Sequence, residues 1–180
     1  MADAGEALNE LAIQLRGEGS VISPHVRDPD GEVPGLGMLV AGGPRAADAP
    51  AEYAILFESI REGYLLHYAS GRLLRDDDRD LVLLAGDHLY ALGLARLAAL
   101  GDLPAVSELA DVISLGAQGH AEGRPDLAEA AWEAGAAAVG WGADDTLQAA
   151  KAAARAGAPE AAAALRAAAR LMAGEVARVR

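Results

Sequence analysis

Apolar and polar residues alternate with helical spacing over most of this chain. The clearest run is DLVLLAGDHLYALGLARLAAL, residues 80–100, where leucines and alanines recur three or four positions apart and further leucines fill the other sides. A helix that is apolar all round is typical of the middle of a domain. We therefore expect residues 80–100 to form the central helix of the fold.

The same periodicity, interrupted at glycines and prolines, predicts six more helices, over residues 1–16, 51–68, 103–119, 127–139, 146–156 and 160–180. Residues 17–50 are rich in proline and glycine and predict a long irregular segment, in which the apolar patch 36–40 can form one helical turn or a wall segment. We expect an all-α antiparallel helix bundle in a single domain over residues 1–180: an N-terminal helix to residue 16, the irregular segment 17–50, and the bundle 51–180.

Composition supports this picture and limits the possible partners. Hydrophobic residues make up 52% of the 180 residues but aromatic residues only 4%, so leucine, valine and alanine must build the core. A net charge of -12 disfavours nucleic acid and anionic membranes, and the absence of cysteine excludes thiolate sites. No signal peptide is visible, and Asp87, His88 and Arg96 interrupt the one run long enough to span a membrane. We expect a cytoplasmic protein without a transmembrane segment.

Polar residues inside the predicted bundle are the candidates for chemistry. Asp87, His88 and Tyr90 lie within the central helix, and His67 and His120 end its two neighbours. They could line a cavity as a ligand site or an acid–base pair. His67, Asp87 and His120, on three successive helices, could also converge as metal ligands. The alternative, which we favour, is that Asp87 is buried and fixes helix packing while the histidines lie at helix ends. We expect no catalytic residue and no cofactor.

An acidic run precedes the central helix. Asp76, Asp77 and Asp80 spell D-D-x-x-D, a spacing that would allow two carboxylates to share a metal ion. Aspartates before a helix also satisfy its free N–H groups and its dipole without any metal, and we favour this capping role.

Two patterns near the C-terminus point to helix pairing. Gly123-Arg124-Pro125-Asp126 and Gly157-Ala158-Pro159-Glu160 are 34 residues apart, the period of tetratricopeptide helical hairpins. In the last predicted helix, a 4-3-4-3 spacing forms an apolar seam for a partner helix, made of Leu165, Ala169, Met172, Val176 and Val179.

One known family shares several segments with this chain. Leu84-Ala85-Gly86-Asp87-His88-Leu89 resembles the L-A-G-D-Y-L signature of trans-isoprenyl diphosphate synthases, the polyprenyl synthetase family. Leu65-Leu66-His67 resembles the L-x-H before that family's first aspartate-rich motif, and Leu109-Ala110-Asp111 with Gly119-His120 resembles a later pair of family segments. The resemblance implies a bundle of the isoprenoid-synthase type around a deep cavity, truncated in this chain.

The departures from the family pattern concern the reaction. After His67 the family has D-D-x-x-D, which binds the magnesium ions that hold the substrate diphosphate, whereas this chain reads Tyr68-Ala69-Ser70-Gly71-Arg72. The resemblance therefore implies a noncatalytic subunit, similar to the small component of two-subunit heptaprenyl diphosphate synthases. Such a subunit would act as a homodimer or as a heteromer with a catalytic prenyl synthase-like subunit. The alternatives are a stand-alone cavity protein for an apolar isoprenoid-like ligand and a helical-hairpin interaction scaffold.

Overall fold

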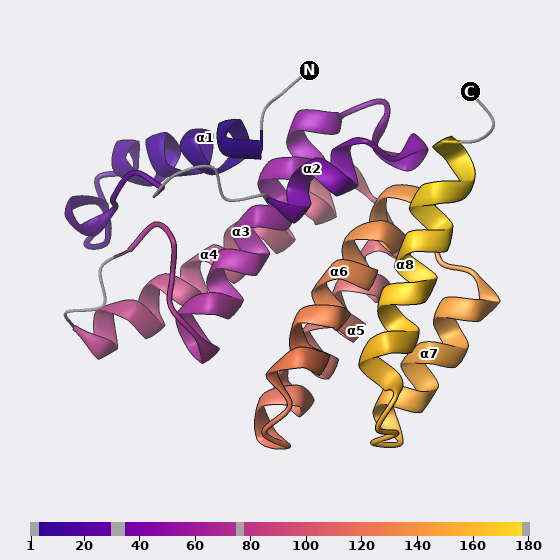
Figure 1. Ribbon diagram of the computed structural model, residues 1–180. Helices are drawn as coiled ribbons and strands as arrows, with labels where there is room; N and C mark the ends of the chain where they lie inside the picture. The colour runs from indigo at the N-terminus through magenta and orange to yellow at the C-terminus, as the bar shows by residue number, and fades with distance from the viewer. Residues whose placement is uncertain (1–3, 30–34, 75–77, 178–180) are drawn as a thin grey trace. The chain divides into compact units, whose positions relative to one another are not determined.

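The computed structural model describes residues 4–29, 35–74 and 78–177 of the chain (Figure 1). Within these residues the secondary structure is helical, apart from one isolated antiparallel bridge between Val26 and Leu74. The all-α prediction is confirmed. The isoprenoid-synthase type and the truncation stay predictions.

The chain divides into two compact units, where the sequence led us to expect a single domain. Unit 1 comprises residues 1–41 and 49–101, and unit 2 comprises residues 42–48 and 102–180. The division concerns compactness only, so the single-domain organisation stays a prediction, and each unit is described by itself.

Unit 1 contains four α-helices and a short 3-10 helix in its described residues: α1 (Ala4–Gly17), η1 (Ser23–His25), α2 (Leu36–Ala41), α3 (Pro50–Tyr68) and α4 (Arg79–Leu100). Of the two forms considered for 36–40, the structure has the helical one, α2, so the Pro- and Gly-rich segment is less irregular than predicted. Helix α3 pairs with α4 and also carries α1 and α2 (Figure 1). An apolar cluster fills the space between α1, the segment after it and α4; it includes Leu11, Leu15, Ile22, Val26, Leu73, Val82, Ala85 and Leu89.

Helix α3, and not α4, is the most buried helix of unit 1. Its buried side chains run almost without a break from Tyr53 to Leu66. Helix α4 buries one side, whereas Leu84 is 52% exposed and Leu94 41% exposed on the other. The predicted central position of residues 80–100 is therefore wrong, because an apolar composition does not distinguish a core helix from a helix with an open apolar side. By length and composition α4 is also the one described helix that could cross a membrane, a test that soluble core helices pass as well.

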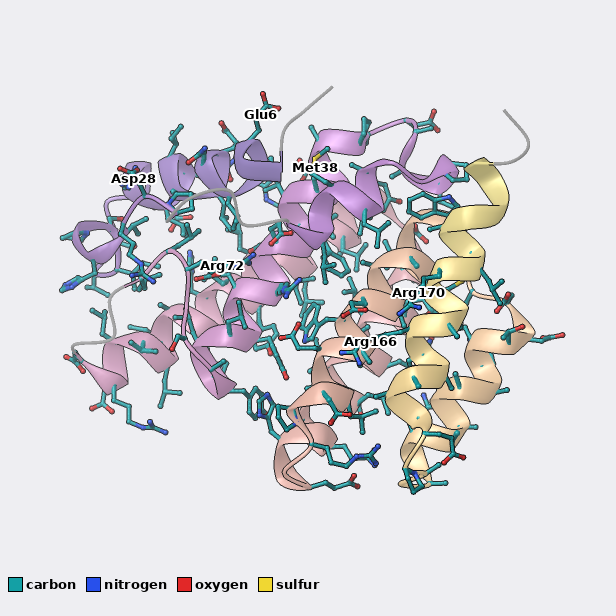
Figure 2. The ribbon with its side chains drawn as sticks, in the orientation of Figure 1. Glu6, Asp28, Met38, Arg72, Arg166 and Arg170 are labelled. Carbon is teal, nitrogen blue, oxygen red and sulfur yellow. The ribbon has the colours of Figure 1, made fainter. Side chains whose placement is uncertain are left out.

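Unit 2 consists of two consecutive helical hairpins and one short segment from earlier in the chain. The hairpins are α5 (Leu103–Ala121) with α6 (Pro125–Trp141), and α7 (Asp145–Arg155) with α8 (Ala161–Ala177). Helix α8 packs on α6, and η2 (Pro44–Ala46) packs on α6 as well. Leu165, Ala169 and Met172 of the predicted C-terminal seam are buried in unit 2, so this part of the seam already has its partner helix, α6. Figure 2 shows Arg166 and Arg170 on α8.

Candidate functional site

Three of the predicted site residues meet where α3 crosses α4. The helices approach closely at Gly63 and Gly86: a Cβ atom on Gly63 would lie 2.9 Å from the carbonyl oxygen of Gly86. A Cβ atom on Gly86 would lie 2.8 Å from Nε2 of His67. The glycine in the Leu84–Leu89 segment is therefore required by packing, because the imidazole of His67 occupies the space that a side chain would take.

His67, Asp87 and Tyr90 form a small polar cluster at this crossing. Nε2 of His67 lies 3.2 Å from Oδ1 of Asp87, and the imidazole stacks on the ring of Tyr90 with centroids 5.5 Å apart. The Asp87 side chain is 74% exposed, so the predicted burial of this carboxylate is wrong. Asp87 does meet a neighbouring helix, but at its surface, where water screens the pair.

Tyr90 is the least satisfied member of the cluster. Its hydroxyl is buried and has no hydrogen-bond partner among the described residues. Burial raises the pKa of Tyr90 well above its ordinary value, and the nearby Tyr68, Tyr64 and Asp87 raise it further. The phenol therefore stays protonated at neutral pH, which does not suit it to act as a general base.

The remaining predicted candidates lie elsewhere. His88 contacts Glu18 through Nε2 at 2.8 Å, away from the His67 pair. His120 belongs to the last turn of α5 in unit 2, so its convergence with His67 and Asp87 stays a prediction. Asp80 is exposed in the first turn of α4, with Asp78 as its N-cap, while Asp76 and Asp77 lie outside the described residues. Over the described ranges, no three His, Asp or Glu side chains are grouped to hold a metal ion.

The sequence analysis missed a buried charge cluster on α3. Glu58 and Glu62 are both fully buried. Oε1 of Glu58 accepts from the Gly37 N–H at 2.6 Å, and its Oε2 lies 2.8 Å from Nη2 of Arg72. Glu62 accepts from the backbone N–H groups of Arg72 and Leu73 and from Nε of Arg72.

These contacts join three segments: α2, α3 and the loop after α3, where Figure 2 labels Arg72. Burial alone would lower the pKa of Arg72, but the charges of Glu58 and Glu62 outweigh it and raise that pKa. Glu62 has donors on both oxygens, and Glu58 has a donor on one oxygen and the Arg72 charge beside the other. These partners within the chain assign the cluster to folding and not to chemistry. The sequence signal for this cluster is the i, i+4 pair of glutamates, Glu58 and Glu62, inside a predominantly apolar helix.

A second missed cluster joins α5 to α7 in unit 2. Lys151 is buried, and its Nζ lies 2.5 Å from Glu108 and 2.9 Å from Asp111. Arg155 also contacts Asp111, at 2.5 Å. Burial opposes the charge on Asp111, but the hydrogen bonds and charges of Lys151 and Arg155 outweigh it and hold the pKa of that carboxyl below its usual range. The cluster fixes the second hairpin against the first.

The 34-residue spacing recurs in the geometry of the two turns of unit 2. Gly123 and Gly157 both have positive φ, 67° and 73°. After the first helix of each hairpin, Gly123 N–H donates to His120 O and Arg124 N–H to Gly119 O, and Gly157 N–H donates to Ala154 O and Ala158 N–H to Ala153 O. Each bond of the first turn has its counterpart 34 residues later, in the arrangement that closes many helices at a left-handed glycine.

The two turns are also in contact. Nη2 of Arg124 donates to the carbonyl oxygens of Ala158 and Pro159, at 3.1 and 3.3 Å. The helices that follow the turns share some buried positions: Leu127, Ala131 and Ala138 are buried, and so are their counterparts Ala161, Leu165 and Met172. Two neighbouring hairpins therefore have equivalent turns and share part of their buried positions.

Comparison with protein-family models, with curated protein sequences and with solved structures found no significant match to this chain.

Proposed function

We propose that this chain is a noncatalytic interaction module built from helical hairpins. The observation that carries the proposal is the pair of equivalent turns in unit 2, with matching glycine conformations and hydrogen bonds 34 residues apart. Stacked helical hairpins form extended surfaces that bind other proteins. The charge clusters of both units agree with a structural role, because their polar atoms are held by partners within the chain.

A second candidate is the noncatalytic prenyl synthase-like subunit suggested by the family resemblance. Two of the resembling segments, Leu65–His67 and Leu84–Leu89, lie against each other, with the His67 imidazole over Gly86 and beside Asp87. This contact explains both segments by packing and involves no diphosphate ligand. In this version the interaction partner is a catalytic prenyl synthase-like chain.

Site-specific photocrosslinking in the source cell tests the interaction function. A benzophenone amino acid at Ser107, exposed on α5, should give a defined crosslinked species, whereas the same group at Ile13, exposed on α1, serves as the control position. A prenyl synthase-like chain in the crosslinked band would support the second candidate. Monomeric protein from both positions and from further sites on α7 and α8 would contradict an interaction module.

A further inference from the structure

The outward side of α5 is an open apolar surface. Positions spaced 3-4-3-4 along it are Leu103, Val106, Ala110, Ile113 and Ala117, flanked by Ser107 and Ser114; these seven residues are the α5 face. Leu103 is 75% exposed, Val106 is 37% exposed, and Ala110, Ser107 and Ser114 are exposed, while Ile113 and Ala117 are half-buried. The charged residues of α5 do not interrupt it, since Glu108 is buried and Asp111 is held by Lys151 and Arg155. Such spacing suits a second helix packed along the face.

The face is complementary to itself when the second helix runs in the opposite direction. With Ala110 opposite its own copy, each large side chain meets a small one: Leu103 faces Ala117, Val106 faces Ser114, and Ile113 faces Ser107. A parallel arrangement would instead place Leu103 on Leu103 and Ile113 on Ile113, and would leave gaps at the small residues. The antiparallel arrangement also orients the two helix dipoles in opposite directions, which is electrostatically favourable.

We propose that the α5 face binds a second copy of this chain, antiparallel, with the two-fold axis at Ala110. This inference rests on the proposed interaction function and names its partner. The absence of charge on the face fits a second copy, because two chains of net charge -12 repel each other least where neither presents a carboxylate. A basic partner would find no carboxylate on the face to recognise.

The area of the contact determines how tightly the two copies are expected to bind. One pair of helices along a face of this length lies at the low end of specific interfaces, under about 1,200 Å², so we expect a reversible dimer with a micromolar or weaker dissociation constant. Added salt should strengthen the dimer, since it screens the repulsion between two acidic chains.

Cysteine crosslinking tests the geometry cleanly, because the chain has no cysteine. Ala110→Cys should form a disulfide-linked dimer under mild oxidation at concentrations that populate the dimer. Leu103→Cys alone should not, because its two copies would lie about 20 Å apart along the helices. The double variant Leu103→Cys/Ala117→Cys should crosslink again. Crosslinking of Leu103→Cys alone as readily as Ala110→Cys would overturn the antiparallel pairing.

Sedimentation with charge variants tests the association itself. Ala110→Glu should remove the dimer, at least tenfold in dissociation constant, whereas Ile13→Glu, at an exposed position of α1, should leave it unchanged. Helical content and melting temperature of both variants must match the parent chain. If the parent chain stays monomeric at all concentrations and salt levels, the proposal that the α5 face binds a second copy is wrong. If photocrosslinking from Ser107 then still traps a different protein, the interaction module stands without self-pairing; if it traps nothing, both fail.

Discussion

At the residue scale, the strongest constraints in this molecule are buried charges and close glycine contacts. Glu62 is the clearest example of a buried charge. It is fully buried on α3 and accepts two backbone N–H groups as well as the guanidinium of Arg72, so it holds the loop after α3 in place.

Replacing Glu62 by Ala should destabilise the protein by about 3–5 kcal/mol, because it leaves the Arg72 guanidinium and two backbone donors without their main acceptor. Glu10→Ala, an exposed glutamate on α1, is the matched control and should change stability by less than about 0.5 kcal/mol. Urea unfolding of both variants measures the difference. Equal midpoints would show that the carboxylate is not buried in solution.

Gly86 is the clearest example of a close glycine contact. Gly86→Ala should destabilise the fold by about 1–3 kcal/mol, because the added methyl group meets Nε2 of His67. In the double variant Gly86→Ala/His67→Ala, space is available again, so the two effects should be clearly non-additive. Thermal melts of the four proteins provide this cycle. Simple additivity would mean that His67 does not lie over Gly86.

At the element scale, the equivalence of the two hairpins of unit 2 predicts equal free-energy costs for a side chain in their two turns. Gly123 and Gly157 are left-handed, and a Cβ atom on either would meet nothing within 4 Å. The penalty for a side chain there is therefore purely conformational, and it should be the same in both turns.

Gly123→Ala and Gly157→Ala should each destabilise the protein by about 1 kcal/mol, since a left-handed conformation is unfavourable for an L-residue. The control is Gly174→Ala in α8, which also has free space but lies within a helix, and it should stabilise by about 0.5–1 kcal/mol. Chemical denaturation measures all three. Costs that differ by more than twofold between the two turns would argue against their equivalence.

The helices could be predicted from sequence because each one is marked by local signals. Asp102 and Asp144 cap α5 and α7, and left-handed glycines close α4 and α5, so the expected boundaries lie within a few residues of those observed. Placement within the fold could not be predicted. Asp87 was expected inside and lies at the surface, whereas Glu58 and Glu62 are fully buried, because burial depends on which helices become neighbours. That information is not local in the chain.

At the scale of the whole molecule, stability should depend on pH through the cluster that joins the two hairpins. The pKa of Asp111 is held below its usual value in the folded state. Its ionised form therefore contributes stability above the unfolded pKa of about 4, and that contribution is lost as the pH falls through the lower folded value.

Unfolding free energies measured from pH 7 to pH 3 should fall more steeply for the parent chain than for Asp111→Asn, which cannot lose this ionisation. The exposed Asp48→Asn is the control and should follow the parent. Parallel curves for Asp111→Asn and the parent would show that Lys151 and Arg155 do not favour the ionised form of Asp111.

The short segment 42–48 determines when unit 2 can assemble during synthesis of the chain. Gly43 packs on Gly140 so closely that a Cβ atom would lie 2.1 Å from the Gly140 carbonyl oxygen, and Arg45 pairs with Asp102 at 2.6 Å. Gly43 leaves the ribosome 97 residues before Gly140. At about 5–20 residues per second, it waits roughly 5–20 s for its binding surface to be made. The order of synthesis is therefore not the order of assembly, because this early segment cannot pack until α6 has been synthesised. A gene cut at residue 101 would separate unit 2 from a segment of its own fold.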